Sequence, residues 1–181
     1  MKNRRVLALG LLGLSVLSLV GCISKPLRPV NADGTYCFRV NNKSRNKTCT
    51  PDAVPTGTIE AEAKRFEPIA GSLTLYVIRK RWGDAINLVN VVVDERKSIT
   101  TIPESVVRIR LTPGEHRVAV QWDGKKDTLM VSGAAGELRF VELVGMVWAW
   151  GGEYRLARDD VEASRARAYA SKLIADVDLQ R

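Results

Sequence analysis

The sequence contains few of the residues that most often carry out chemistry. It has one histidine, His116, and three cysteines. It contains neither a Gly-x-Ser-x-Gly nucleophile elbow nor a glycine-rich phosphate loop. Zinc sites use several Cys or His ligands, and this chain offers too few of them near one another. These absences predict a protein that is not an enzyme and that has no metal site and no cofactor.

The first 22 residues have the layout of a secretory signal. A basic stretch at residues 2–5 precedes an uncharged run over residues 6–20. The segment ends in Leu19-Val20-Gly21-Cys22, which resembles the bacterial lipobox. The resemblance implies that residues 1–21 are removed as a signal peptide and that Cys22 is acylated as the new first residue.

A single transmembrane anchor is the competing interpretation of this segment. A spanning helix usually needs about 20 apolar residues, and residues 6–23 are fewer and are interrupted by glycines and serines. The lipoprotein signal is therefore preferred. Because several acyl chains hold a protein firmly in a membrane, we expect stable attachment.

With Cys22 assigned to lipid, Cys37 and Cys49 remain as an even pair. Disulfides persist outside the cytoplasm, and the spacing of these two residues is not that of a redox Cys-x-x-Cys site. We predict a structural disulfide between them.

The composition changes near residue 70. Residues 23–70 contain five of the seven prolines and show no apolar period. We predict residues 22–70 to be the lipidated N-terminus and a flexible tether, with a looped segment at 36–50 and a short helix at 58–66. Residues 71–181 are predicted to form the folded domain.

From residue 71 the pattern becomes the alternation that is typical of half-buried strands. The run over residues 86–93 is rich in β-branched residues and predicts a strand buried on both sides. Asp123-Gly124 predicts a hairpin turn. Other alternating segments lie at 73–77, 107–111, 116–122, 129–131, 138–140 and 154–156. About seven short strands predict a mainly β fold, an antiparallel β-sandwich.

The chain is predicted to end in one α-helix over residues 160–177. Asp159 and Glu162 have the spacing of a capping box, and the alanines that follow, with Leu173 and Val177, fall on one helical face. We expect this helix to pack on the sheet or to cover one of its edges.

Residues 111–120, Leu-Thr-Pro-Gly-Glu-His-Arg-Val-Ala-Val, suggest a family. The passage resembles the strand-turn-strand of PEGA domains and of the bacterial lipoprotein family called domain of unknown function 2846. The resemblance covers residues 71–177 and departs from the family in a basic insertion at 79–85. It implies a transthyretin-like sandwich on a lipid anchor, with no established activity.

His116 is the one candidate general base. It shares one face of a predicted strand with Val118, Val120 and Trp122, and a base also needs a partner within reach. A histidine in such a position more often bonds a turn carbonyl. A structural role is therefore preferred, and an enzyme acting on an envelope polymer with His116 as base is the alternative.

Arg79-Lys80-Arg81-Trp82 places an aromatic residue at the end of a basic run, in a predicted loop. This pattern suits a site for anionic head groups or glycans, and a solvated turn is the alternative.

Trp148 and Trp150 point the same way on a strand. They form either a buried aromatic layer, which is preferred, or an exposed contact for a partner or lipid.

Removal of the predicted signal leaves 25 basic and 20 acidic residues, a formal net charge of +5. This charge favours acidic partners, and solubility alone is the alternative explanation. We expect a lipid-anchored, non-enzymatic binding or scaffold module of the cell envelope that contacts anionic lipid, a glycan or an envelope protein, and no nucleic acid. By family analogy, an aspartate after the acylated cysteine retains a lipoprotein in the inner membrane. Ile23 stands there instead, which favours the outer membrane, facing the periplasm.

The lipobox interpretation predicts the result of a Cys22→Ala substitution. Without the thiol that accepts the lipid, the chain should accumulate as precursor or mislocalise, and metabolic labelling with a fatty-acid analogue should be lost. Lipid label retained on the Cys22→Ala chain would rule out Cys22 as the attachment site.

Overall fold

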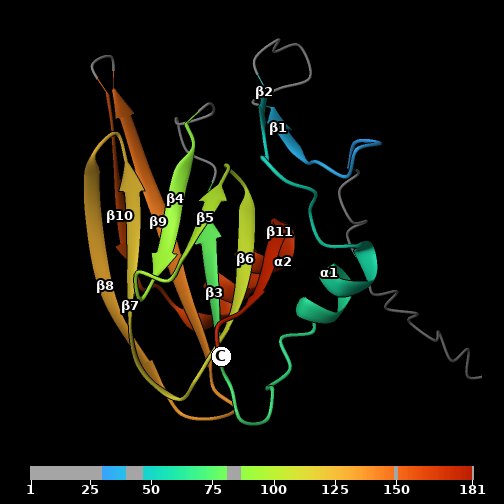
Figure 1. The fold of residues 1–181 in the computed structure, drawn as a ribbon, viewed down its shortest axis with the longest axis vertical. Helices are drawn as coiled ribbons and strands as arrows, with labels where there is room; N and C mark the ends of the chain where they lie inside the picture. Colours follow the sequence, from blue (N-terminus) through green and yellow to red (C-terminus); the bar gives the residue numbers. More distant parts are fainter. Residues whose placement is uncertain (1–29, 40–46, 81–86, 149–150, 181) are drawn as a thin grey trace, which may run out of the picture.

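The computed structural model describes residues 30–39, 47–80, 87–148 and 151–180, with residues 147 and 148 described by their backbone alone (Figure 1). The signal peptide and Cys22 therefore lie outside the described residues. No helix in the described ranges is long and apolar enough to cross a membrane.

The folded chain is a β-sandwich, as predicted. The strands of its two large sheets are β3 (Leu73–Arg79), β4 (Val89–Val93), β5 (Lys97–Thr101), β6 (Ser105–Leu111), β7 (Gly114–Trp122), β8 (Lys125–Gly133), β9 (Leu138–Trp148), β10 (Gly151–Ala157) and β11 (Lys172–Asp178). The five-stranded sheet has the order β10-β9-β3-β6-β11, and the four-stranded sheet has the order β5-β4-β7-β8. Most neighbours are antiparallel, but β3 pairs with β9 and β6 pairs with β11 in parallel.

The main core lies between the two sheets and follows from the alternation of the strands. Every second residue of a strand faces the same side. Leu75 of β3 and Ile109 of β6 meet Val91 of β4 and Val120 of β7 there, all with no exposed surface. The two-residue turn at 123–124 joins β7 to β8 as predicted, since both residues adopt a positive φ.

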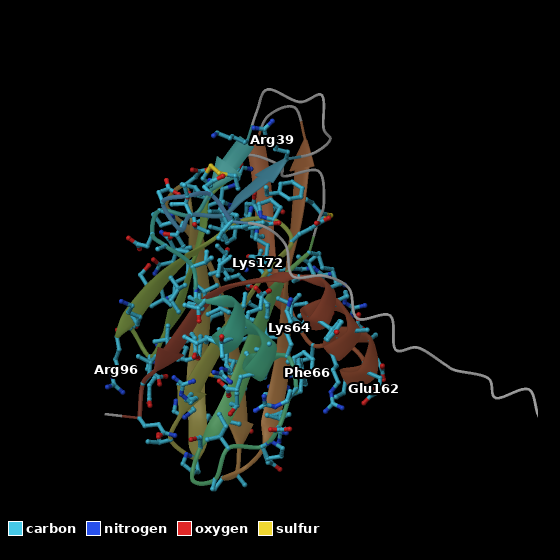
Figure 2. The ribbon with its side chains drawn as sticks, turned by 90° about the vertical axis from the view of Figure 1, so that its right-hand side faces the viewer. Arg39, Lys64, Phe66, Arg96, Glu162 and Lys172 are labelled. Carbon is cyan, nitrogen blue, oxygen red and sulfur yellow. A yellow bond between two sulfur atoms is a disulfide. The ribbon has the colours of Figure 1, made fainter. Side chains whose placement is uncertain are left out.

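A second, smaller core lies on the outer face of the five-stranded sheet, beneath two helices. These are α1 (Gly57–Ala63) and α2 (Val161–Ala170). Phe66, which follows α1, packs edge-on against Tyr76 of β3 and Phe140 of β9. Figure 2 shows Phe66 and Lys64 beside the helices. The central strand β3 is therefore buried at every position.

The C-terminal helix is shorter than the predicted 160–177. Asp160, rather than Asp159, caps its start by accepting from the amide of Ala163 at 2.9 Å, and the helix ends at Ala170. Ser171 is extended, and the chain continues as β11 along β6. Pairing with the otherwise free edge of β6 overrides the helical periodicity, because each residue of β11 gains partners in the sheet.

The folded part of the chain begins before residue 71. The strands β1 (Cys37–Arg39) and β2 (Lys47–Cys49) pair, and the predicted disulfide joins Cys37 to Cys49. Tyr36 and Phe38 belong to the main core and are 6% and 4% exposed. The N-terminal hairpin, which forms a small sheet of its own, and the short helix α1 are thus part of the folded domain. The predicted tether therefore does not extend to residue 70.

Burial of the N-terminal hairpin predicts the effect of Phe38→Ala. Removing a buried phenylalanine side chain typically costs about 3–5 kcal/mol, so the free energy of unfolding measured in urea should fall by an amount in that range. Val30→Ala is the matched control, since Val30 is 46% exposed. Equal unfolding midpoints for both variants would show that the hairpin does not contribute to the core.

Candidate functional site

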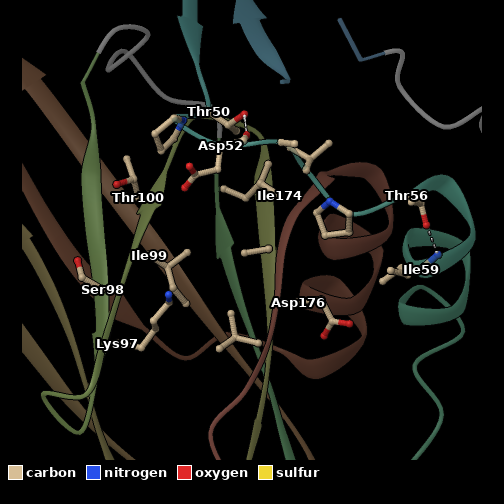
Figure 3. Close-up of a pocket in the computed structure, with 16 residues that line it drawn as sticks. Thr50, Asp52, Thr56, Ile59, Lys97, Ser98, Ile99, Thr100, Ile174 and Asp176 are labelled. Atoms are coloured by element: carbon tan, nitrogen blue, oxygen red, sulfur yellow. Dashed lines mark hydrogen bonds between the residues drawn. The ribbon is translucent and has the colours of Figure 1, made fainter. Parts of the chain in front are cut away.

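A groove of about 490 Å³ lies between the edge strands of the two sheets. The strands β5 and β11 each end their sheet on this side of the sandwich. Residues 97–100 of β5 and 174–177 of β11 form its walls, and residues 50–56 with Ile59 complete it. Figure 3 shows Ile99 of β5 pointing toward Ile174 of β11 across the groove, whereas Asp176 points away from it, toward the helices.

The interior of the groove is apolar and its rim is polar. Ile99 and Ile174 are both 7% exposed and belong to the main core. Val54, Ala175 and Val177 are partly buried against them. Lys97 and Ser98, in contrast, are exposed on the β5 side. An apolar floor beneath a row of polar groups can accept a chain segment that alternates apolar and polar residues.

The N-terminal hairpin holds the end of the groove in place. Thr50 donates its backbone N–H to the carbonyl of Tyr36 at 2.8 Å, and its hydroxyl donates to the carbonyl of Asp52 at 2.8 Å. The amide of Val54 donates to the carbonyl of Gly34 at 2.9 Å. The disulfide and the buried aromatic residues thus fix the segment that crosses the groove.

The opposite side of the sandwich is closed. There the backbone N–H of Leu156 in β10 donates to the carboxylate of Asp127 in β8 at 2.7 Å. The indole of Trp122 donates to the carbonyl of Gly152 at 2.9 Å. The first bond joins the edge strands β8 and β10 directly and the second joins β7 to β10, whereas the edges of β5 and β11 are separated by the groove.

The carboxylate of Asp176, a residue of the β11 wall, is neutralised by arginines. Arg108 binds it through Nε at 2.9 Å and Nη2 at 2.8 Å, and Arg110 binds it at 2.6 Å. Arg108 also binds both carboxylate oxygens of Glu62, which ties α1 to β6 and β11. Burial acts to raise the pKa of Asp176, but the bonds and charge of Arg108 outweigh it, and the pKa lies below its ordinary value of 3.8.

The predicted basic binding run does not form one surface in the described residues. Arg79 is the last residue of β3 and is 1% exposed. Its guanidinium donates to the carbonyls of Thr101 at 2.6 Å and Asn87 at 2.8 Å. Lys80 forms ion pairs with Glu142 and Asp159. Arg79 is buried because its position in β3 faces the main core, so it is a structural cation rather than a loop residue.

The remaining residues of the predicted binding surfaces are not described. Arg81, Trp82 and Trp150 lie outside the described ranges, and the side chain of Trp148 is not described. Their assignment to a binding surface stays a prediction.

His116 is held between two acceptors. Its Nδ1 lies 2.6 Å from the carboxylate of Asp94, and its Nε2 lies 2.8 Å from the backbone carbonyl of Thr112. Asp94 also accepts from the amide of Arg117 at 2.8 Å. Burial acts to raise the pKa of Asp94, but the bonds from His116 and Arg117 leave it below its ordinary value. The contact with a turn carbonyl is the one expected from the sequence.

Sequence reasoning missed both walls of the groove. Residues 97–101, Lys-Ser-Ile-Thr-Thr, contain the β-branched residues that favour a strand, and this signal was available. Residues 172–177 fall within the predicted helix because Leu173 and Val177 also fit a helical period. Nothing in the local pattern reveals that the two segments meet across the sandwich.

Among the described residues, no group of three or more His, Cys, Asp or Glu side chains is placed to hold a metal ion.

A comparison of this chain with protein-family models and with curated proteins finds no match. The resemblance of residues 111–120 to lipoprotein domains therefore stays an interpretation of that passage.

The lowered pKa of Asp176 predicts acid sensitivity. A carboxylate whose pKa is depressed on folding stabilises the protein above its unfolded pKa, and this contribution is lost as the pH falls through the folded pKa. Asp176→Asn should lower the free energy of unfolding near neutral pH and should reduce its dependence on pH below about pH 4. Urea unfolding across this range measures both effects.

Glu67→Gln is the control for this titration, because the side chain of Glu67 is 65% exposed and its ion pair with Arg65 lies at the surface. A pH dependence for Asp176→Asn identical to that of the unmodified protein would show that Asp176 does not contribute to acid sensitivity.

Proposed function

We propose that this protein is a lipid-anchored, non-enzymatic binding module of the cell envelope, and that it captures an extended segment of an envelope protein in the groove between β5 and β11. The observation that carries this proposal is the groove itself, which has an apolar floor and an edge strand on each side.

The edge position of β5 supports recognition by strand addition. Along an antiparallel strand, alternate residues direct their N–H and C=O groups to opposite sides. β5 pairs with β4 on one side only, so part of its backbone faces the groove. A partner segment that adds to this edge gains main-chain hydrogen bonds, while the apolar floor around Ile99 and Ile174 selects its side chains.

The surroundings of His116 favour binding over catalysis. A general base needs a free nitrogen lone pair within reach of the substrate. Both ring nitrogens of His116 already face an acceptor, Asp94 on one side and the Thr112 carbonyl on the other. The alternative function is an enzyme that acts on an envelope polymer with His116 as base. It requires one ring nitrogen of His116 to leave its acceptor and reach a substrate.

The location follows from the sequence. We place the protein at the outer membrane, facing the periplasm, because Cys22 ends a lipobox-like motif and Ile23 follows it. Anionic lipid or glycan contacts at Arg81, Trp82, Trp148 and Trp150 remain part of the proposal, as secondary surfaces.

Site-specific photo-crosslinking in the envelope tests the groove. A photo-reactive amino acid at exposed Ser98 on β5 should capture a protein, and mass spectrometry should map the adduct to one extended segment of it. The same group at Lys126, which is exposed on the opposite edge strand β8, is the matched control and should capture little.

A blocked groove and a changed histidine complete the test. Ala175→Arg places a long side chain in the groove and should abolish the Ser98 adduct, provided that thermal unfolding shows a folded protein. His116→Gln should retain the adduct. Equal capture from positions 98 and 126, or adducts with lipid or glycan alone, would contradict the proposal, and loss of function in a folded His116→Gln protein would favour the enzyme.

A further inference from the structure

A second concavity lies away from the groove, between the two helices on the outer face of the five-stranded sheet. It measures about 510 Å³ and is lined by Lys64, Phe66, Glu162, Arg165, Ala166, Tyr169 and Ala170. Figure 2 shows Lys64 and Phe66 near α1, with Glu162 on α2. This helix pocket shares no lining residue with the groove, so an inference from it is independent of the proposed function.

The pocket combines aromatic rings with cations. The guanidinium of Arg165 lies 5.8 Å from the centre of the Phe66 ring, and the ammonium of Lys64 lies 5.9 Å from the centre of the Tyr169 ring. Two alanines, Ala166 and Ala170, leave space between these groups. Such a surface favours a ligand that has both an apolar body and a negative charge.

Arg165 supplies the group that would bind the charge. Its Nε is buried against the protein, but the side chain as a whole is 41% exposed. Its Nη1 lies 3.8 Å from the carboxylate of Glu162, which is 78% exposed, so this ion pair is weak. A carboxylate accepts from two N–H groups of one guanidinium at once, so the terminal nitrogens of Arg165 can hold the carboxylate of a ligand.

A cluster of lysines next to the pocket also favours a negatively charged ligand. Lys64 and Lys172 both bind the single carboxylate of Glu60, which is fully buried. Two ammonium groups around one carboxylate give this cluster a net positive charge, and Lys64 presents it to the pocket.

We propose that the helix pocket binds a small amphipathic carboxylate, such as a fatty acid, with its carboxylate on the guanidinium of Arg165 and its apolar body on Phe66, Ala166 and Tyr169. The neutral alcohol of the same shape should bind weakly, because it offers Arg165 no charge.

Binding of 4-phenylbutyrate and of 4-phenylbutanol to the full chain in lipid nanodiscs tests the proposal, with empty nanodiscs as the baseline. Saturation-transfer NMR should show saturable binding of the acid and weaker binding of the alcohol. Arg165→Gln should reduce affinity for the acid about ten-fold or more, the effect of losing a charge-assisted hydrogen bond, and should leave the alcohol unchanged. Tyr169→Ala should weaken both ligands.

Two further variants keep the result interpretable. Arg165→Lys retains the charge but lacks the paired N–H groups of the guanidinium, and it should bind the acid with intermediate affinity even if the glutamine variant does not fold. Arg117→Gln removes a surface arginine of β7 that pairs with Glu95 and should bind as the unmodified chain does. Absence of saturable binding, equal affinity for acid and alcohol, or unchanged affinity in both Arg165 variants would overturn the proposal.

Discussion

The arrangement of the helices on the outer face of the five-stranded sheet depends on the contacts of one carboxylate, that of Glu60. It binds Lys172 and Lys64, and it accepts the backbone N–H of Leu173 at 3.1 Å. One buried carboxylate therefore holds the end of α1 against the start of β11. A buried ion pair adds little net stability, but the loss of one partner leaves an uncompensated charge in the interior. Both the groove and the helix pocket are built on elements that Glu60 positions.

A second buried carboxylate, that of Glu142, holds α2 against the sheet. It is 1% exposed and binds Lys80 at the end of β3, together with Arg167 and Ser164 of the helix. The outer face of the sheet is thus not a simple apolar layer. Its small aromatic core is bordered by charged contacts that determine where each helix lies.

The sandwich could be predicted from the sequence because its strands alternate strictly around the main core, as at Leu73, Leu75 and Val77. The disulfide followed from counting cysteines. The groove and the helix pocket could not be predicted, because each depends on contacts between distant segments. The segment around Lys172 shows most clearly why local sequence is not enough. It fits a helix as well as a strand, and it forms a strand because Lys172 binds Glu60 and β11 pairs with the edge of β6.

The partners of Glu60 also determine when the protein can finish folding. Lys172 lies 112 residues after Glu60 in the sequence, and β11 pairs with β6 in parallel. A chain that is synthesised from its N-terminus cannot bury Glu60 against Lys172 or complete the five-stranded sheet until β11 has been made. Long-range and parallel pairings of this kind fold slowly. Until β11 pairs, Glu60 lacks Lys172 and β6 lacks its outer neighbour, so the pairing of β11 completes both the buried ion cluster and the five-stranded sheet.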